Sequence, residues 1–308
     1  MDIHKGHSPL VLLEVILTRV NCAFTVDVEG FAESHVQSVR IDDAYLDHAV
    51  MDREIEANMQ VTLDLLQGHG IRGTFFFLGR IARTSPQIVR RTADAGHEIG
   101  CHSLNHLRIT GQSRDDFRRD LKSAKSALED ASGAQVIGFR APDFSIGAGN
   151  LWAFDELLEA GFRYDSSVVP TTIHDVYGMT NVPETVFKWP NGLVEFPMPV
   201  TRVLGSRIPV GGGGYFRLFP LSWTIRAFSS RNAKSQPATF YIHPYEIGPV
   251  APNLPGLSLA RRFRHYVRLK DGANRIKPFL NALTFGSMAD VLVSHGFLAS
   301  ISPNTEVR

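Results

Sequence analysis

The chain has 308 residues, of which 44% are hydrophobic and 20% are charged, and its formal net charge is +1. This length supports a sizeable core, and this balance excludes a disordered or fibrous protein. A charge so close to zero gives no general attraction to nucleic acid, so we predict no nucleic-acid partner. The two cysteines, Cys22 and Cys101, lack CxxC spacing and are predicted to be buried thiols, with no disulfide framework.

Residues 9–26 are rich in apolar side chains, but Glu14 and Arg19 interrupt them before any run reaches the roughly 18–20 residues of a membrane span. A secretion signal would need a basic leading segment and a small-residue cleavage site, and neither is evident. We therefore expect no membrane span, a cytoplasmic location and an N-terminal extension over residues 1–20. Nothing in the sequence indicates an oligomeric state.

From residue 22 onward, short apolar segments alternate with segments of helical periodicity. Apolar runs rich in β-branched and aromatic residues predict strands at 22–28, 72–79, 97–102, 136–142 and 162–167. Apolar residues at helical spacing predict helices at 51–70, 85–96, 113–131 and 150–160. Strands that are apolar on both faces and alternate with helices are typical of β/α units around a parallel sheet or barrel.

Beyond residue 170 the regular alternation ends. Segments 194–200 and 238–244 predict further strands, separated by irregular insertions that include the glycine run 211–214. No internal repeat and no low-complexity linker divides the chain. The simplest organisation is one α/β catalytic domain over residues 21–250.

The C-terminal part, residues 251–308, is predicted to be a helical extension packed on this domain. Its segment 257–285 is basic and aromatic. We interpret the Arg and Lys side chains there as a solvated helical face, with carbohydrate or partner contact as the alternative.

Reactive side chains gather at the predicted carboxyl ends of the strands. In chain order they are Asp27, Glu29, His102, His106, Arg140, Asp165 and His243. The carboxyl ends of the strands in β/α barrels meet at one face, where active sites form. A structural core avoids such residues, because buried charges must be paired or bound. We therefore predict a catalytic site at this face.

The residue types indicate a mononuclear metal site. The imidazoles of His102 and His106 with one carboxylate oxygen suit zinc or a similar divalent ion such as cobalt. Such an ion lowers the pKa of its bound water and polarises a carbonyl group. A second carboxylate can accept the proton of that water, and a separate histidine can protonate the leaving group.

Five stretches, in chain order, resemble the motifs of the polysaccharide deacetylases of the NodB-homology type, carbohydrate esterase family 4. They are TVDVEG (25–30), HSLNH (102–106), RAPDFS (140–145), YDSS (164–167) and FYIHP (240–244). The resemblance implies a distorted (β/α) barrel with seven strands. The motifs are most similar to the subgroup associated with exopolysaccharide and O-antigen gene clusters, as are the later stretches GGGGYFRLFP (211–220) and RRFRHYVRL (261–269).

The resemblance also implies roles for the site residues. His102 and His106 would hold the metal together with a carboxylate. His243 would act as general acid, and Asp165 would orient it.

The first motif departs from the commoner form, in which two adjacent aspartates divide the roles of base and ligand. Here Val28 separates Asp27 from Glu29. Residues i and i+2 of a strand point to the same face, so both carboxylates can reach the site. We assign Asp27, oriented by Arg140, as base and Glu29 as metal ligand, and the reverse or a shared role stays open. The residues that follow, 30–38, replace the aromatic-rich loop common after this motif, so we expect an altered sugar-binding surface.

The function implied is hydrolytic removal of an acetyl group from an amino sugar in a polysaccharide or its precursor. Two alternatives remain open. One is a related hydrolysis of a carbon–nitrogen bond, by a deformylase acting on a carrier-linked sugar or by a cyclic-amide hydrolase. The other is a catalytically silent carbohydrate-binding relative. Retention of all five motifs argues against the silent relative.

Overall fold

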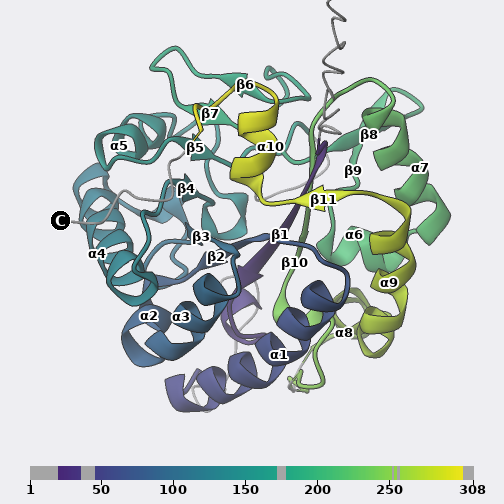
Figure 1. Ribbon diagram of the computed structural model, residues 1–308, viewed down its shortest axis with the longest axis horizontal. Helices are drawn as coiled ribbons and strands as arrows, with labels where there is room; N and C mark the ends of the chain where they lie inside the picture. Colours follow the sequence, from purple (N-terminus) through teal and green to yellow (C-terminus); the bar gives the residue numbers. More distant parts are fainter. Residues whose placement is uncertain (1–19, 36–45, 172–177, 252, 255–256, 301–308) are drawn as a thin grey trace, which may run out of the picture.

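The structure is a computed structural model that describes residues 20–35, 46–171, 178–251, 253–254 and 257–300 (Figure 1). The predicted N-terminal extension, residues 1–20, lies outside the described residues except for its last position. Within the part of the chain that is described, no helix is long and apolar enough to cross a membrane.

A nine-stranded sheet forms the centre of the fold, in the order β10-β1-β2-β3-β4-β5-β7-β6, with β11 paired to the start of β1. All neighbouring strands are parallel except β6 and β7. The strands are β1 (Cys22–Val28), β2 (Thr74–Phe77), β3 (Glu98–Cys101), β4 (Gly138–Phe139), β5 (Tyr164–Asp165), β6 (Phe187–Lys188), β7 (Val194–Glu195), β10 (Ala238–Ile242) and β11 (Phe285–Gly286). The predicted α/β fold around a parallel sheet is confirmed. The sheet curls into a half-barrel, and among the described strands its two ends, β10 and β6, do not pair with each other.

Helices surround the sheet on its outer side (Figure 1). They are α1 (His48–Gly68), α2 (Gly79–Thr84), α3 (Pro86–Asp94), α4 (Arg114–Ser132), α5 (Ala153–Glu159), α6 (Gly213–Leu218), α7 (Leu221–Asn232), α8 (Leu259–Tyr266), α9 (Gly272–Ala282) and α10 (Met288–Ser294). All seven residues of β1 are buried. This central strand is therefore covered on both faces, as expected for a parallel sheet flanked by helices.

Local sequence signals define the ends of the long helices. Asp47 precedes α1 and its side chain accepts a hydrogen bond from the backbone N–H of Val50. Ser113 caps α4 in the same way by accepting from Asp116 N–H. Gly133 follows α4 with φ +70°, a left-handed conformation that glycine adopts without steric cost. These caps satisfy backbone groups that a helix end leaves without partners.

Several predicted boundaries differ from the structure. The predicted strand 72–79 ends at Phe77, and Gly79 already begins the short helix α2. The predicted strand 136–142 is paired only at Gly138 and Phe139, because the chain then turns into a short 3₁₀ helix at Pro142–Phe144. A hairpin of β8 (Val200–Val203) and β9 (Ser206–Pro209) was not predicted. Short strands and turns carry too few residues for a periodic signal.

The C-terminal part of the chain adds a strand to the central sheet as well as packing against it. It contributes β11, whose residues Phe285 and Gly286 pair with Cys22 and Ala23 at the start of β1. Helix α10 also contacts β1. The C-terminal extension is therefore part of the central sheet and its core.

The glycine run 211–214 brings its backbone close to β10. Gly212 has φ +135° and forms a parallel bridge with Tyr241. A Cβ atom at Gly212 would lie 1.8 Å from the backbone oxygen of Tyr241, so only glycine fits there. Helix α6 begins at the next residue and carries Arg217 toward the strand ends.

We expect Gly212→Ala to lower the free energy of unfolding by about 2 kcal/mol or more, because it adds both backbone strain and a steric clash. Gly214→Ala is the matched control. A Cβ there meets its nearest neighbour, Arg217 Nη2, only at 3.9 Å. Urea unfolding followed by circular dichroism measures both variants. Equal stability of the two variants would contradict this explanation of the glycine run.

Candidate active site

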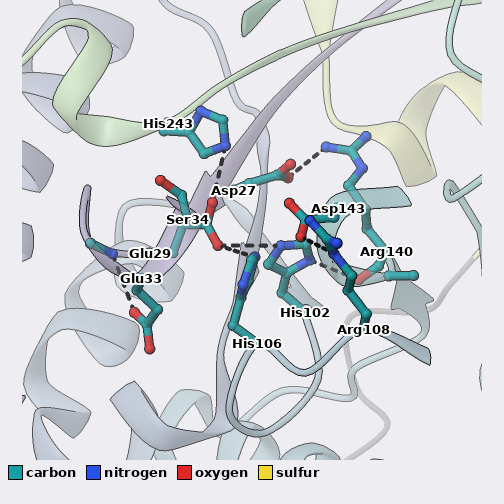
Figure 2. Close-up of polar contacts among 12 residues, drawn as sticks. Asp27, Glu29, Glu33, Ser34, His102, His106, Arg108, Arg140, Asp143 and His243 are labelled. Atoms are coloured by element: carbon teal, nitrogen blue, oxygen red, sulfur yellow. Dashed lines mark hydrogen bonds and ion pairs between the residues drawn. The ribbon is translucent and has the colours of Figure 1, made fainter. Parts of the chain in front are cut away.

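A cavity of about 440 Å³ opens where β1, β3, β4 and β10 end. Asp27, Glu29, His102, His106 and His243 all line it. Figure 2 shows these side chains converging from separate strand ends. The structure thus brings together residues that are up to 216 positions apart in the chain, Asp27 and His243 being the extremes (243 − 27).

Arg140 is a fully buried cation that binds Asp27. Its Nη1 donates to Asp27 Oδ1 over 2.6 Å and to Thr25 Oγ1 over 2.8 Å. Its Nη2 donates to Ser166 Oγ over 3.0 Å. The guanidinium carbon lies 4.3 Å from the centre of the Phe76 ring. A charge removed from water in this way requires such partners, and here they hold the Asp27 carboxylate at a defined place in the cavity.

Glu29 follows Asp27 on the same face, as the alternation of the strand predicts. Its Oε2 lies 2.5 Å from His106 Nε2 and 3.7 Å from His102 Nε2. All three side chains are at most 3% exposed, and one ligand atom from each lies within 4.8 Å of the other two. Among the described residues, Glu29 Oε2 has no hydrogen bond of acceptable geometry although it is buried. Two imidazole nitrogens facing a buried carboxylate oxygen form a donor set that fits a divalent metal such as zinc.

The tautomer of His102 supports this fit. Its Nδ1 lies 2.7 Å from the backbone oxygen of Arg140. A carbonyl oxygen only accepts, so Nδ1 carries the proton and the neutral ring presents the lone pair of Nε2 to Glu29. Metal-binding histidines are commonly oriented in this way by a partner on the second ring nitrogen.

The loop that carries the two histidines has a strained backbone. Ser103 and His106 have φ values of +68° and +56°, which are unusual for residues with a side chain. Hydrogen bonds hold the loop: Gly79 N–H donates to Ser103 O, and Leu104 N–H donates to Asp120 Oδ2, both over 2.9 Å. Such strain persists only where several surrounding contacts hold the backbone in that conformation, and it is frequent at functional sites.

Charge interactions shift the pKa values of this cluster in the metal-free protein. Burial acts to raise the pKa of Glu29, but His106 and His243 outweigh it and hold that pKa well below its usual value. Burial acts to lower the pKa of His106, but the Glu29 carboxylate outweighs it and raises that pKa to about 9. For His102, burial dominates and lowers the pKa. His102 is therefore neutral near pH 7, while His106 carries a proton beside the Glu29 carboxylate.

His243 is held by Glu246. Its Nδ1 lies 3.0 Å from Glu246 Oε2, and its backbone N–H donates to the same oxygen over 3.0 Å. The other ring nitrogen, Nε2, lies 3.1 Å from Glu29 Oε1 (Figure 2). Arg217 Nε donates to Glu246 Oε1 over 2.8 Å, so the carboxylate is itself held in place. Burial acts to lower the pKa of His243, but Glu246 and Glu29 outweigh it and raise that pKa to about 10.

The predicted role of Asp165 needs correction. Its carboxylate accepts hydrogen bonds from Ser167 N–H over 3.0 Å and from Ser167 Oγ over 2.7 Å. On the next strand its register partner is Glu195, and burial raises the pKa of Asp165 to about 6. In the described structure both ring nitrogens of His243 are occupied by other carboxylates, so Asp165 does not orient it. The YDSS stretch contributes to the site indirectly, through the hydrogen bond that Ser166 Oγ accepts from Arg140.

Glu246 and Arg217 were missed by the sequence reasoning. A signal for Glu246 exists, because it lies three residues after His243 and Pro244 begins a short helical turn between them. A carboxylate three residues after a helix start can reach back to the starting residue. For Arg217 no comparable local signal exists, since it approaches from the separate helix α6.

Two family models match successive parts of the chain. Residues 34–164 match the family model described as polysaccharide deacetylase, and residues 166–293 match a domain of unknown function, DUF3473. The chain therefore contains a polysaccharide deacetylase domain over residues 34–164, followed over residues 166–293 by a second domain of unknown function.

Individual relatives match over shorter stretches. The peptidoglycan-N-acetylmuramic acid deacetylase PdaA of Bacillus subtilis is 36% identical over 73 residues, which are 24% of this chain and 28% of the relative. A chitooligosaccharide deacetylase of Sinorhizobium fredii is 36% identical over 81 residues, 26% of this chain and 38% of the relative. The matches thus cover well under half the length of either relative.

Two solved structures share the fold. A candidate polysaccharide deacetylase of Mycobacterium smegmatis superposes with a TM-score of 0.61 at 21% identity, over 94% of each chain. The PuuE allantoinase superposes with a TM-score of 0.60 at 14% identity, over 93% of this chain and 94% of the other. At such low identity these similarities establish the fold alone.

We expect Glu246→Gln to lower the pKa of His243 in the metal-free protein by about 1 to 3 pH units, because a negative charge that stabilises the imidazolium is removed. NMR titration of labelled histidine measures this pKa. Asp165→Asn is the control and should leave it unchanged. A large shift in the Asp165 variant, with none in the Glu246 variant, would restore Asp165 as the orienting residue.

Proposed function

We propose that the protein hydrolyses the N-acetyl group of an amino sugar in a polysaccharide or its precursor, with the help of a divalent metal. One observation carries the proposal. A single cavity holds a carboxylate fixed by arginine, a Glu–His–His ligand set and a histidine fixed by a second carboxylate. The deacetylase relatives, which act on peptidoglycan and chitooligosaccharides by their names, support the same chemistry.

Glu29, His102 and His106 would hold the metal, which we propose to be zinc, with cobalt as an alternative. A divalent ion there supplies Lewis acidity toward an amide carbonyl and makes water more acidic. The buried ligand atoms and the fixed Nε2 lone pair of His102 support this assignment.

Asp27 acts as general base in this proposal. Arg140 binds its Oδ1, which leaves the second carboxylate oxygen able to accept a proton from water. The guanidinium also fixes the position of the carboxylate, and a fixed base near the reacting atoms is what proton transfer requires. Of the two carboxylates Asp27 and Glu29, Glu29 is the one that groups with His102 and His106 and lies within ion-pair distance of both, which supports the division of roles.

His243 acts as general acid in this proposal. A departing amine needs a proton, and in the metal-free protein His243 carries one near pH 7, because Glu246 and Glu29 raise its pKa to about 10. Glu246 fixes Nδ1, so Nε2 is the atom that faces the Glu29 edge of the cavity. The acid therefore lies beside the metal ligands, where the bond to nitrogen would break.

We expect Asp27→Asn and His243→Ala each to lower kcat by about 10²- to 10⁴-fold, because each removes a proton-transfer group. Release of acetate and free amine from acetylated chitooligosaccharides and peptidoglycan fragments measures this activity. Circular dichroism and zinc content serve as controls for the fold and for metal loading. Turnover near that of the unaltered protein in either variant would contradict the role assignment.

A panel with formylated sugars and cyclic amides, run with the same protein, separates the related reactions. Preference for either class over acetylated amino sugars would replace the proposed substrate. A zinc-loaded protein that is inactive on every substrate would identify a silent relative.

Metal binding should become tighter as the pH rises. In the metal-free protein the pKa of His106 is about 9, so at pH 7 a metal must displace a proton from this site. Between pH 6 and 8 we expect the apparent zinc affinity to rise by about tenfold per pH unit, with about one proton released. Calorimetry in buffers of different ionisation enthalpy measures both quantities. An affinity independent of pH, or one unchanged in His106→Ala, would contradict this ligand set.

A further inference from the structure

Helix α8 (Leu259–Tyr266) presents two different faces. Arg264 and His265 line the active-site cavity. Leu259 and Phe263, one helical turn apart, are 87% and 62% exposed. Residues at i and i+4 lie on one face of a helix, so the two apolar side chains form a stripe directed away from the cavity. A helix that covers a core normally buries its apolar stripe, and this one exposes it.

Basic side chains accompany this stripe. Residues 257–285 contain seven Arg and Lys residues and one acidic residue, Asp271. Arg262 and Arg268 are exposed, and Arg262 lies over the Tyr266 ring at 5.7 Å. Arg268 Nη1 donates to the backbone oxygen of Arg217 over 3.0 Å, which ties this basic segment to α6 beside the cavity.

The cavity rim continues the same character. Leu218, at the end of α6, is 39% exposed and also lines the cavity. Figure 1 shows α8 at the end of the sheet toward which β1 points. Exposed apolar side chains and an excess of positive charge thus gather around the opening of the site. We call the exposed side of α8, with Leu259, Arg262 and Phe263, the α8 face.

We propose that the α8 face docks on an anionic lipid membrane surface and brings the cavity to that surface. Interfacial helices bury Leu and Phe at the boundary of headgroups and acyl chains, while Arg binds the phosphates. A stable protein partner would need about 800 Å² of matched surface on each side, much more than two apolar side chains on a convex helix provide. The charge excess of this segment is complementary to anionic lipid. This inference goes beyond the hydrolytic function and does not depend on it.

A second exposed apolar site provides a contrast. Leu204, at the turn between β8 and β9, is fully exposed. The nearby Arg202 and Arg207 both pair with Glu184, at 2.6 and 2.8 Å. That hairpin therefore has an exposed leucine whose two neighbouring cations share one carboxylate, so its local charge excess is smaller than that of the α8 segment, and it serves as the control.

The test is sedimentation of the full-length, zinc-loaded protein with vesicles of phosphatidylcholine alone or mixed equally with phosphatidylglycerol. We expect binding to the anionic vesicles only, weakened by high salt. The double variant Leu259→Ser/Phe263→Ser should bind at least roughly tenfold more weakly, and Arg262→Glu should also bind more weakly. Leu204→Ser should bind like the unaltered protein. Unchanged thermal unfolding of each variant controls for the fold.

Three results would overturn the proposal: no binding of the unaltered protein to anionic vesicles, equal binding by the double variant, or an equal loss in Leu204→Ser. Light scattering adds a further outcome. Self-association that the double variant abolishes, without vesicle binding, would assign the α8 face to a second copy of the chain. Because vesicle binding needs no substrate, a failure to bind vesicles would not count against the proposed hydrolysis. Likewise, a failure to detect hydrolysis would not count against membrane docking.

Discussion

The buried pairing of Arg140 with Asp27 is the interaction on which the site depends. The guanidinium is fully buried and bonds to both β1, through Thr25 and Asp27, and the segment after β5, through Ser166. The backbone oxygen of the same residue receives Nδ1 of His102. One residue therefore fixes the proposed base, sets the tautomer of a proposed metal-binding histidine and joins two strand ends. Removal of one partner would leave a buried charge uncompensated, which is costly.

The site is divided between parts of the chain that family comparison treats separately. Asp27 and Glu29 precede the segment 34–164 that matches the deacetylase model, and His243 and Glu246 lie in the segment 166–293 of unknown function. In the fold these parts are adjacent, because β10 pairs with β1 in parallel and carries His243 to the same end. The C-terminal half thus supplies the proposed general acid and its partners, and β11 completes the sheet.

Much of the fold could be predicted from sequence because its physical signals are local. The apolar runs of β1 and β2 and the glycine after α4 are each recognisable from a few consecutive residues of the sequence. The same holds for Asp27 and Glu29, whose shared direction follows from strand alternation. The contact of His243 was predicted wrongly, since the ring could be paired with any carboxylate at the same face. The partner Glu246 was within reach of local reasoning, whereas Arg217 depends on how α6 packs. Gly212 is similar, because its close approach to Tyr241 is a tertiary constraint.

The most direct test of the central claim is the crystal structure of the zinc-loaded protein, with anomalous diffraction at the zinc edge. The account predicts one strong peak within roughly 2.0–2.2 Å of a Glu29 oxygen and of Nε2 in His102 and His106, with Asp27 bound to Arg140 and His243 bound to Glu246. A zinc ion held by Asp27 instead of Glu29, or by His243, would contradict the assignment of base, ligands and acid.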